Sequence, residues 1–582
     1  MKIVLLLAFI VLQSHCRSET FTDRFDESLL IKPLPSGHVY TNFQFVVQKD
    51  LNDGEEFNHF RLFPRSLGEI VSEHDVQELH FSLTQGLWRY EKWGYPVRSA
   101  PPGAELWTLF KGKASNINSN WEKLTRVLSG QFCASLNFID DSNTATPKLS
   151  FRPEGAVVTD QPYNSSFVRY AALPSEIVCT ENLTPFRKLL PCGAQAGLTT
   201  LLNALNVFNA HYVSLAVDIR TVCKDTCSKV AIELVQSVSI VFDPPVTQLG
   251  KQDWSFVKLF GSSLTSTCPV ATHSKVYVDI SSNKTGVPFT LNVVPNANPN
   301  KQDINIEYVD DVEFAVYDLK KLFTETRFVN IGANYQGNHI YGIVPSPVLF
   351  VDRKISGYGQ EQGGIHCTFY NNDPKKHMKV LYFDVVPWYL RLYSHTLIAR
   401  SGNKILKPDY LYYLPARDRT RPHHLELVLT LPPKSKTEMS IDFDFAFLKW
   451  TEYPPDANHG FYTGSAVIST LLDSTKNFSV IPDVTLKRNE KGNFIRIYTQ
   501  ILLVSLPTPD FSMPYNVICL TCTVVALAFG PIHNITTKRL QPLSENDESS
   551  FVSKLKKRLK NWWKSQGKEE VTEVPEESKK TQ

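Results

Sequence analysis

The side chains that offer this chain the most varied chemistry are its ten cysteines. A thiol can form a disulfide, bind a metal or act as a nucleophile, depending on its compartment and surroundings. Cys16 lies in an apolar N-terminal stretch, and Cys519 and Cys522 lie in an apolar run near the C-terminus, where they act as small apolar residues. Seven remain: Cys133, Cys179, Cys192, Cys223, Cys227, Cys268 and Cys367. Seven is odd, so in an oxidising compartment at least one cannot pair within the chain.

The surroundings of these cysteines predict different roles. Cys223 and Cys227 are close together in a short loop and are expected to bridge each other. Zinc is the poorer alternative, because no second pair of ligands has suitable spacing, and we predict no metal site. Cys133 is flanked by apolar residues, which predicts a buried thiol. Cys179 lies in a loop-like, exposed stretch and is the better candidate for a bond to another chain.

Motifs that would indicate catalysis are missing from the sequence. It has no nucleophile elbow, no His-Glu-x-x-His, no phosphate-binding loop and no dinucleotide fingerprint. His366 and Cys367 are adjacent, but neighbours on a strand point to opposite faces, so they are poorly placed to act together. Asp310-Asp311 is interpreted as a solvated turn. We therefore expect no catalytic residue and no cofactor.

Two apolar segments set the topology. Residues 3–12 follow Met1-Lys2 and precede a polar stretch, which is typical of a secretory signal peptide over residues 1–18; the segment is short for the alternative, a signal anchor. Tyr515–Ile532 has no charged side chain and is long enough to cross a bilayer, which needs about 20 residues. Residues 497–514 contain no Lys or Arg, whereas basic residues follow the span. Because positive residues stay cytosolic, we predict a single-pass type I protein with a large lumenal ectodomain.

The predicted cytosolic tail has two further features. Its apolar residues Phe551, Leu555, Leu559 and the pair Trp562-Trp563 share one helical face, with lysines opposite. This pattern favours a basic amphipathic helix on an anionic membrane leaflet over a solvated helix. Lys579 and Lys580 stand fourth and third from the C-terminus and resemble a dilysine signal for retrieval to the endoplasmic reticulum. The net charge of +3 comes largely from this tail, so no nucleic-acid partner is implied.

The ectodomain is predicted to be α+β at first and mostly β afterwards. Apolar residues at helical spacing predict helices within Glu105–Leu136 and Leu183–Leu205. From about Val213 onward strand patterns dominate, as in Val230–Phe242 and Ile441–Phe447, and predict antiparallel β-sandwiches. The expected parts are a signal peptide (1–18), an α+β domain (19–212), a β-rich region (213–505), a juxtamembrane linker (506–514), a transmembrane helix (515–535) and a cytosolic tail (536–582).

Sequons fit a lumenal ectodomain. The candidate glycan acceptors are Asn164, Asn182, Asn283 and Asn477. Asn534-Ile-Thr lies beyond the span and is expected to stay unmodified.

Several long blocks carry a family resemblance. They include Leu128–Asp140, Val178–Pro185, Val386–Tyr393, Leu448–Tyr453 and Leu506–Ala526. Rich in Trp, Tyr and Cys, they run along nearly the whole ectodomain and the span. The sequence resembles the PIG-T family, the lumenal subunit of the glycosylphosphatidylinositol (GPI) transamidase. Cys367, the particular tail sequence and the C-terminal Lys-Lys-Thr-Gln are not part of this pattern, so inferences from them are local to this chain.

The resemblance implies a non-catalytic scaffold in an endoplasmic-reticulum complex. That complex cleaves a C-terminal signal from a precursor and joins the new C-terminus to the ethanolamine amine of GPI. Its nucleophile belongs to a caspase-like subunit, PIG-K, which the family is thought to tether through an intermolecular disulfide; the matching residue here is Cys179. A glycan on Asn182 would crowd that bond, so its sequon is doubtful. We further expect Cys192–Cys268 and Cys223–Cys227 bridges, with Cys133 and Cys367 reduced.

Two other features could contact partners. Cys522, Ala526 and Gly530 recur every four residues and form a ridge of small side chains, which lets transmembrane helices approach closely. We expect this face to pack on a polytopic subunit. The Asn458-His459 turn could face the GPI glycan, with a purely structural turn as the alternative. An independent lumenal hydrolase or a sugar-binding receptor is the competing function, although the sequence nominates no nucleophile for it.

Overall fold

The computed structural model divides the chain into two compact units, Met1–Thr508 and Pro509–Gln582. Each is described by itself. The structure describes residues 23–51, 60–112, 114–155, 164–224, 229–247, 251–281, 288–294, 305–309, 312–335, 346–357, 362–454, 456–472, 493–508, 512–539 and 551–565. The predicted signal peptide lies outside these residues.

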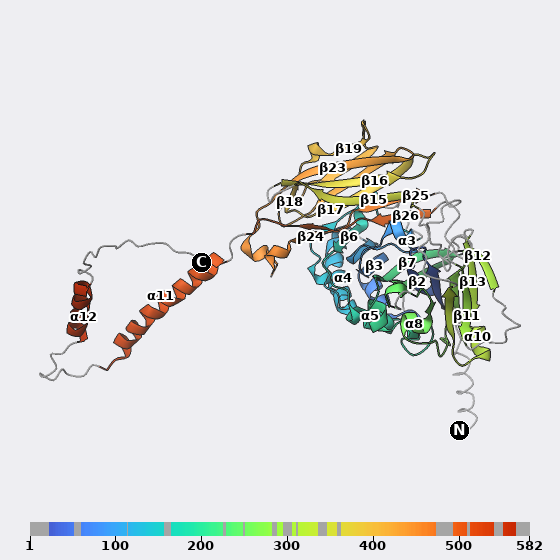
Figure 1. The fold of residues 1–582 in the computed structure, drawn as a ribbon, viewed down its shortest axis with the longest axis horizontal. Helices are drawn as coiled ribbons and strands as arrows, with labels where there is room; N and C mark the ends of the chain where they lie inside the picture. The colour runs from blue at the N-terminus through green and yellow to red at the C-terminus, as the bar shows by residue number, and fades with distance from the viewer. Residues whose placement is uncertain are drawn as a thin grey trace, which may run out of the picture. The chain divides into compact units, whose positions relative to one another are not determined.

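A large twisted sheet organises the first unit (Figure 1). Within the described residues it has eleven strands in the order β12-β13-β10-β1-β2-β8-β7-β3-β4-β6-β5. Neighbouring strands are antiparallel except β1 and β10, which are parallel. The strands are β1 (Arg24–Pro33), β2 (Val39–Leu51), β3 (Val76–Gln85), β4 (Gly103–Phe110), β5 (Thr144–Ala145), β6 (Val168–Leu173), β7 (Tyr212–Lys224), β8 (Lys229–Phe242), β10 (His273–Asp279), β12 (Asn305–Val309) and β13 (Val312–Asp318).

Both faces of this sheet are buried, which explains why its strands carry near-continuous apolar runs. In β1, Leu29 and Ile31 enter one core, while Leu30 enters another on the opposite face. Successive strand residues point to opposite faces, so an apolar residue at every position means that both sides are covered. Helices cover the first face, and a β-sandwich packs on the second.

The helices on the first face are amphipathic. In α4 (Ile117–Phe132) the buried residues Trp121, Leu124 and Leu128 recur at three- and four-residue spacing, as a core-facing stripe requires. The other α-helices among the described residues of this unit are α2 (Arg65–Glu73), α3 (Tyr90–Trp93), α5 (Thr180–Lys188), α6 (Ala204–Phe208), α7 (Pro244–Thr247), α8 (Phe256–Phe260) and α10 (Leu319–Glu325). A small sheet, β11-β14-β9, adds β9 (Trp254–Ser255), β11 (Phe289–Val294) and β14 (Asn330–Tyr335).

A two-sheet sandwich follows in the chain. One sheet has the order β15-β16-β23-β19-β20 with β18 also on β23, the other β21-β22-β17-β25-β26, and β24 pairs with β27. The strands are β15 (Leu349–Ser356), β16 (Gln362–Asn371), β17 (Met378–Val386), β18 (Leu390–Leu392), β19 (Ile398–Ser401), β20 (Lys404–Leu406), β21 (Tyr410–Leu414), β22 (His423–Leu431), β23 (Ser435–Phe445), β24 (Phe461–Thr463), β25 (Val467–Leu472), β26 (Asn493–Tyr498) and β27 (Leu502–Val504).

Specific hydrogen bonds join the sandwich to the large sheet. The buried Tyr95 hydroxyl donates to the Leu349 carbonyl at 2.7 Å and accepts from the Leu349 N–H. The Tyr498 hydroxyl donates to Glu105 of β4 at 2.8 Å. Polar groups buried with partners on both sides fix one arrangement of the two layers.

The mostly β fold with antiparallel sheets is confirmed, but two details of the prediction are corrected. Residues 105–110, expected in a helix, belong to β4, and the helix there begins at Ile117. The boundary predicted between residues 212 and 213 separates strands that hydrogen-bond to each other, because β8 lies between β2 and β7. The change from the first sheets to the sandwich comes instead between β14 and β15.

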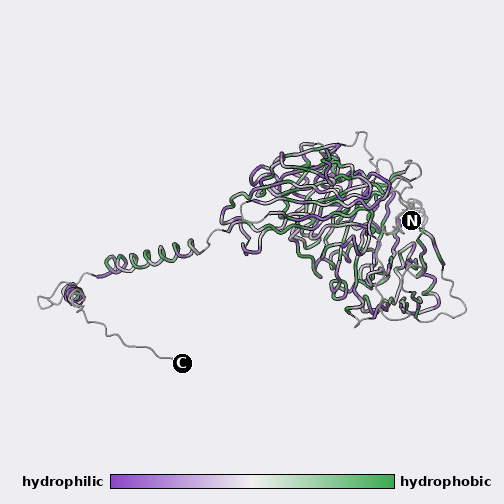
Figure 2. The backbone as a smooth tube through the Cα atoms, turned by 45° about the horizontal axis from the view of Figure 1, so that its top comes forward, coloured by the Kyte–Doolittle hydropathy of each residue, from purple (hydrophilic) through white to green (hydrophobic). Residues whose placement is uncertain are grey.

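The second unit contains two described helices, α11 (Ser512–Thr537) and α12 (Phe551–Ser565). Tyr515–Thr537 is long and apolar enough to cross a membrane, and none of it is buried within the chain. Figure 2 shows α11 as a largely hydrophobic helix. This agrees with the predicted transmembrane helix over 515–535 and extends its C-terminal end by two residues.

Candidate functional site around Cys179

Cys179 is the N-cap residue of helix α5. It has an extended backbone and precedes the first helical residue, Thr180, and its side chain is half-buried and unpaired. Its backbone carbonyl accepts from the Asn182 N–H at 3.1 Å. The thiol therefore lies at a defined helix end, next to the backbone N–H groups of the first helical turn. The sequence had indicated an exposed loop here, and the structure instead gives a fixed helix end.

The side chain of Asn182 holds this helix end in place. Its amide oxygen accepts from the Cys179 N–H at 2.8 Å, and its amide nitrogen donates to the carbonyls of Phe132 and Cys133 at 3.1 and 3.0 Å. One buried amide therefore satisfies an unpaired donor at the start of α5 and two unpaired acceptors at the end of α4. The nitrogen that would carry a glycan is already used in these two bonds.

Cys133 lies close to this helix end, because its carbonyl accepts from the Asn182 amide. The prediction that its thiol is buried is wrong. The residue is exposed and lies just after α4 in a left-handed conformation, with φ at 53°. The apolar stripe of α4 ends at Phe132, so the next residue turns outward. The backbone N–H of Ser135 donates to Glu176 at 2.9 Å, which also ties the segment before Cys179 to the segment after Cys133.

Two exposed apolar side chains lie close to these cysteines in the sequence. Ile177 is 83% exposed and Phe138 is 69% exposed. A partner protein that bonded to Cys179 would be able to cover such exposed apolar side chains, because interface cores are rich in apolar residues. We refer to Cys133, Phe138, Ile177 and Cys179 as the Cys179 patch.

Helix α5 is fixed to the rest of the fold at several points. The Gln236 amide of β8 donates to the Phe186 carbonyl at 3.1 Å. Just beyond the helix, Cys192 forms a disulfide with Cys268. The Leu198 N–H donates to the buried Glu27 of β1 at 3.1 Å. The patch therefore stands on a rigid support, as precise attachment of a partner requires.

The remaining predicted cysteine sites differ in outcome. The Cys192–Cys268 pair expected from the resemblance is present. Cys227 and the side chain of Cys223 lie outside the described residues, so their bridge stays a prediction. Cys367 is unpaired and buried in β16, facing the opposite way from the half-buried His366.

The environment of Cys367 makes it unreactive. Burial raises the pKa of its thiol to about 12, and its sulfur lies 3.5 Å from the Tyr382 hydroxyl. That hydroxyl donates to Asp384 at 2.8 Å, which pairs with the buried Arg353. A protonated thiol inside a structural network is not a nucleophile.

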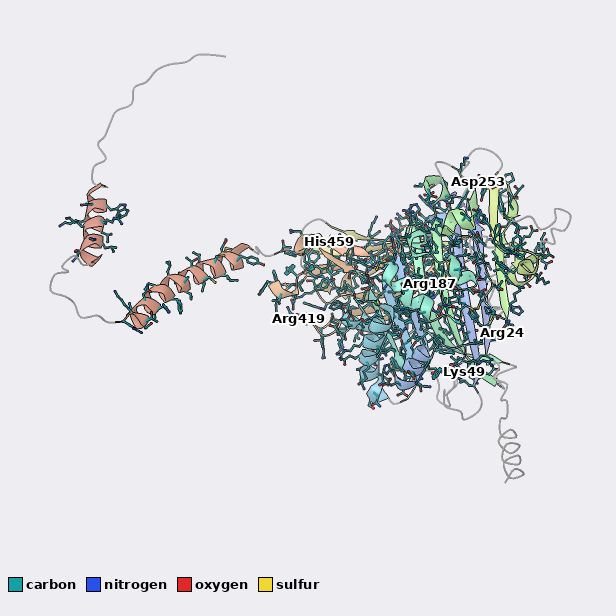
Figure 3. The ribbon with its side chains drawn as sticks, turned by 90° about the horizontal axis from the view of Figure 1, so that it is seen from below. Arg24, Lys49, Arg187, Asp253, Arg419 and His459 are labelled. Atoms are coloured by element: carbon teal, nitrogen blue, oxygen red, sulfur yellow. A yellow bond between two sulfur atoms is a disulfide. The ribbon has the colours of Figure 1, made fainter. Side chains whose placement is uncertain are left out.

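The Asn458-His459 turn is exposed, and His459 is labelled in Figure 3. Hydrogen bonds within the turn hold its shape. Asp456 accepts from the Asn458 N–H at 3.1 Å, and His459 Nε2 lies 2.8 Å from the Tyr462 hydroxyl. Gly460 follows with φ at 87°, where a Cβ would meet the Val504 carbonyl. These bonds give the turn a structural role, and its contact with a glycan stays a prediction.

Two of the four sequons fall on described residues. Asn164 is exposed, and its side-chain oxygen accepts from the Ser166 N–H at 2.9 Å. Asn182 is 2% exposed. Asn283 and Asn477 lie outside the described residues, as do Lys579 and Lys580.

On the span, Cys522 and Ala526 are exposed, and nothing lies within 4 Å of a Cβ placed on Gly530. The neighbouring Thr521 and Thr523 hydroxyls donate to carbonyls one turn back, at 2.8 and 2.7 Å. Their polar groups are thus satisfied inside the helix, as an apolar environment requires. The ridge is uncovered in the single chain and is available to another helix.

Sequence reasoning singled out Cys179 but did not predict that Asn182 holds its helix end or that Cys133 lies close by. Asparagine three residues after the helix-capping residue is a weak signal of a reciprocal cap. Its two bonds to α4, about fifty residues earlier, have no local signal. The sequon around Asn182 also directed attention to a glycan rather than to packing.

Fold and site together define a class: a β-rich protein that has one span-length helix among its described residues and a thiol patch held on a fixed helix end. The family model described as "Gpi16 subunit, GPI transamidase component" matches residues 3–248 and 244–562. The human GPI-anchor transamidase component PIGT is 45% identical over 535 residues, covering 90% of this chain and 92% of that protein. The GPI transamidase component GPI16 of Saccharomyces cerevisiae is 32% identical over 581 residues, covering 92% of each.

The chain therefore belongs to the Gpi16 family of GPI transamidase components. Among solved structures, the major pilin subunit of Bacillus cereus matches at 9% identity with a TM-score of 0.20, covering 40% of this chain and 69% of that chain, which is too slight to bear on fold or function.

Proposed function

We propose that this chain is a non-catalytic scaffold of a GPI transamidase, and that Cys179 joins it by a disulfide to the caspase-like catalytic subunit. The observation that carries this proposal is the Cys179 patch. A half-buried thiol without a disulfide partner lies there on a helix end that hydrogen bonds from neighbouring segments hold in place, and the exposed Ile177 precedes it by two residues in the chain.

The chemistry of the reaction explains why such a scaffold is useful. Transamidation proceeds through a thioester that must meet an amine before water reaches it. A catalytic subunit held in one orientation near the membrane can receive a lipid-borne amine and a membrane-proximal peptide together. Holding reactants in the correct geometry supplies a large part of such rate enhancements.

The second unit provides the proposed membrane anchoring. In this account α11 crosses the endoplasmic-reticulum membrane, with the bulk of the chain lumenal, and its ridge of Cys522, Ala526 and Gly530 packs on a polytopic subunit. Helix α12 then lies on the cytosolic leaflet. Leu555 and Leu559 are 49% and 50% exposed, so this helix presents apolar side chains that a lipid surface can bury. Lys579 and Lys580 act as the retrieval signal.

The competing function, an independent lumenal hydrolase, needs a nucleophile. Among the residues that the structure describes, the thiol of Cys367 is buried and protonated. Cys133 and Cys179 have neither a histidine hydrogen bond nor a buried cleft among their described contacts. A sugar-binding role for the exposed Asn458-His459 turn is tested by photo-crosslinking from position 458 to a GPI analogue.

Non-reducing electrophoresis of the purified complex separates these readings. The scaffold account predicts a heavier, thiol-sensitive band that disappears with Cys179→Ser. Cys133→Ser is the matched control, because this second thiol belongs to the same patch but is not the proposed link. If the band survives Cys179→Ser and disappears with Cys133→Ser, then Cys133 forms the bond and the proposed assignment to Cys179 is wrong.

A further inference from the structure

Three side chains with metal-binding chemistry meet at one end of the large sheet. His38 directly precedes β2, His211 directly precedes β7 and Asp243 directly follows β8. Because Val39 is paired with Phe242 and Tyr212 is paired with Val241, the strand register brings the three residues together. They are far apart in the sequence, so no spacing rule could have predicted them.

The distances between their donor atoms suit a small cation. His211 Nε2 lies 2.9 Å from Asp243 Oδ2, and His38 Nε2 lies 3.7 Å from the same oxygen. One donor atom from each residue lies within 4.8 Å of the others. Bonds of about 2.0–2.1 Å in a tetrahedron separate neighbouring donors by roughly 3.3 Å. Only small side-chain rotations are needed to reach that geometry.

Neighbouring groups orient two of the three donors. Ser36 Oγ lies 2.9 Å from His38 Nδ1, which leaves Nε2 facing the cluster. Asp243 Oδ1 accepts from the Val246 N–H at 3.3 Å, so Oδ2 is the oxygen presented to the histidines. Hydrogen bonds of this kind, to the far side of each ligand, are the usual support of metal ligands.

We propose that His38, His211 and Asp243 form a Zn²⁺ site. Two imidazole nitrogens and one carboxylate are a ligand set that zinc favours over calcium or magnesium, which prefer oxygen ligands. The His211 side chain is 45% exposed, so water can complete the coordination. The ion links the β1–β2 turn to the ends of β7 and β8. The Arg89 guanidinium lies over the Trp93 ring, which contacts the His38 ring. Its positive charge repels the bound ion and therefore limits the affinity of the site for Zn²⁺.

The test uses the full-length chain in detergent, purified through a tag without histidines, stripped with a chelator and treated with N-ethylmaleimide to block free thiols. Co²⁺ serves as the spectroscopic probe and Zn²⁺ as its competitor. We expect one equivalent of Co²⁺ to give a tetrahedral visible spectrum that Zn²⁺ abolishes. His211→Ala and Asp243→Asn should each lose it, and the exposed-histidine control His459→Ala should keep it.

A thermal measurement guards against misfolded variants. Zn²⁺ should raise the unfolding midpoint of the wild type and of His459→Ala, while His211→Ala should fold with an unchanged midpoint in chelator and show no shift with Zn²⁺. The proposal is overturned if the wild type binds no Co²⁺, or if His211→Ala and Asp243→Asn bind it as the wild type does. Because thiols are blocked throughout, neither result depends on the Cys179 tether.

Discussion

Replacing Asn182 with alanine tests whether the patch is built as described. The change removes three hydrogen bonds, one from the Cys179 N–H and two to the carbonyls of Phe132 and Cys133. Each is worth about 1 kcal/mol net, and buried groups left unpaired cost more. Cys133 is exposed, so water can reach its carbonyl and recover part of the loss. We expect Asn182→Ala to lower the free energy of unfolding by about 2–3 kcal/mol.

The matched control is Thr184→Ala. It destroys the same sequon but leaves the Asn182 amide, and Thr184 is an exposed helical residue whose replacement by alanine slightly favours the helix. With an unfolding entropy of about 2.1 cal/mol/K per residue, a unit of this size loses about 1 °C per kcal/mol. The thermal midpoint should fall by about 2–3 °C with Asn182→Ala and stay unchanged with Thr184→Ala.

Two further measurements make this prediction specific. Hydrogen exchange should quicken in residues 176–186 of Asn182→Ala, because the start of α5 loses its cap. Treatment with an N-glycosidase should shift the wild type and Thr184→Ala equally, since Asn182 carries no glycan. If Thr184→Ala instead removes one glycan, the amide nitrogen is modified rather than hydrogen-bonded, and the reasoning is refuted.

Three other predictions concern separate parts of the chain. Ala526→Leu and Gly530→Leu should reduce co-purification of the other subunits without affecting membrane insertion, because bulk on the ridge prevents close helix contact; unchanged recovery would contradict this packing. The Cys367 thiol has a folded pKa of about 12 against an ordinary value of 9.0, so its stabilising contribution is complete below pH 9 and is lost as the pH rises toward 12. Stability measured from pH 8 to 11 should therefore fall more steeply in the wild type than in Cys367→Ala, by up to about 1.4 kcal/mol per pH unit, and equal slopes would argue against a buried neutral thiol. A peptide of residues 548–568 should bind vesicles with anionic lipid and release them as salt rises, while Leu555→Glu/Leu559→Glu should not bind; equal binding by both would indicate charge attraction alone.

Local patterns predicted several strands because their residues follow the pleat. Val230–Phe242 and Ile441–Phe445 are strands in the structure, within β8 and β23. Residues 105–110 were misassigned because every position of β4 is buried, and an apolar run around the buried Glu105 also fits helical spacing. Where both faces of a strand are covered, the period of two disappears.

Long-range pairing was beyond the sequence. β8 lies between β2 and β7, so strands from both sides of the boundary predicted near residue 212 pair in one sheet. No local pattern in the sequence indicates this pairing. The same limit applies to the site. Cys179 is identifiable from its motif and from cysteine parity, but its neighbour Cys133 and its support Asn182 meet only after α4 and α5 have packed.

The central claim is that Cys179 binds the scaffold covalently to another subunit. The most direct measurement is mass spectrometry of peptides from the complex, digested without reduction after free thiols have been alkylated. We predict that the peptide containing Cys179 is recovered linked to a peptide of a different chain. The peptides containing Cys133 and Cys367 should be recovered without a partner; the exposed Cys133 is alkylated in the folded protein, and the buried Cys367 is alkylated only after unfolding. Recovery of Cys179 as a free alkylated thiol, or linked to Cys133, would contradict the account.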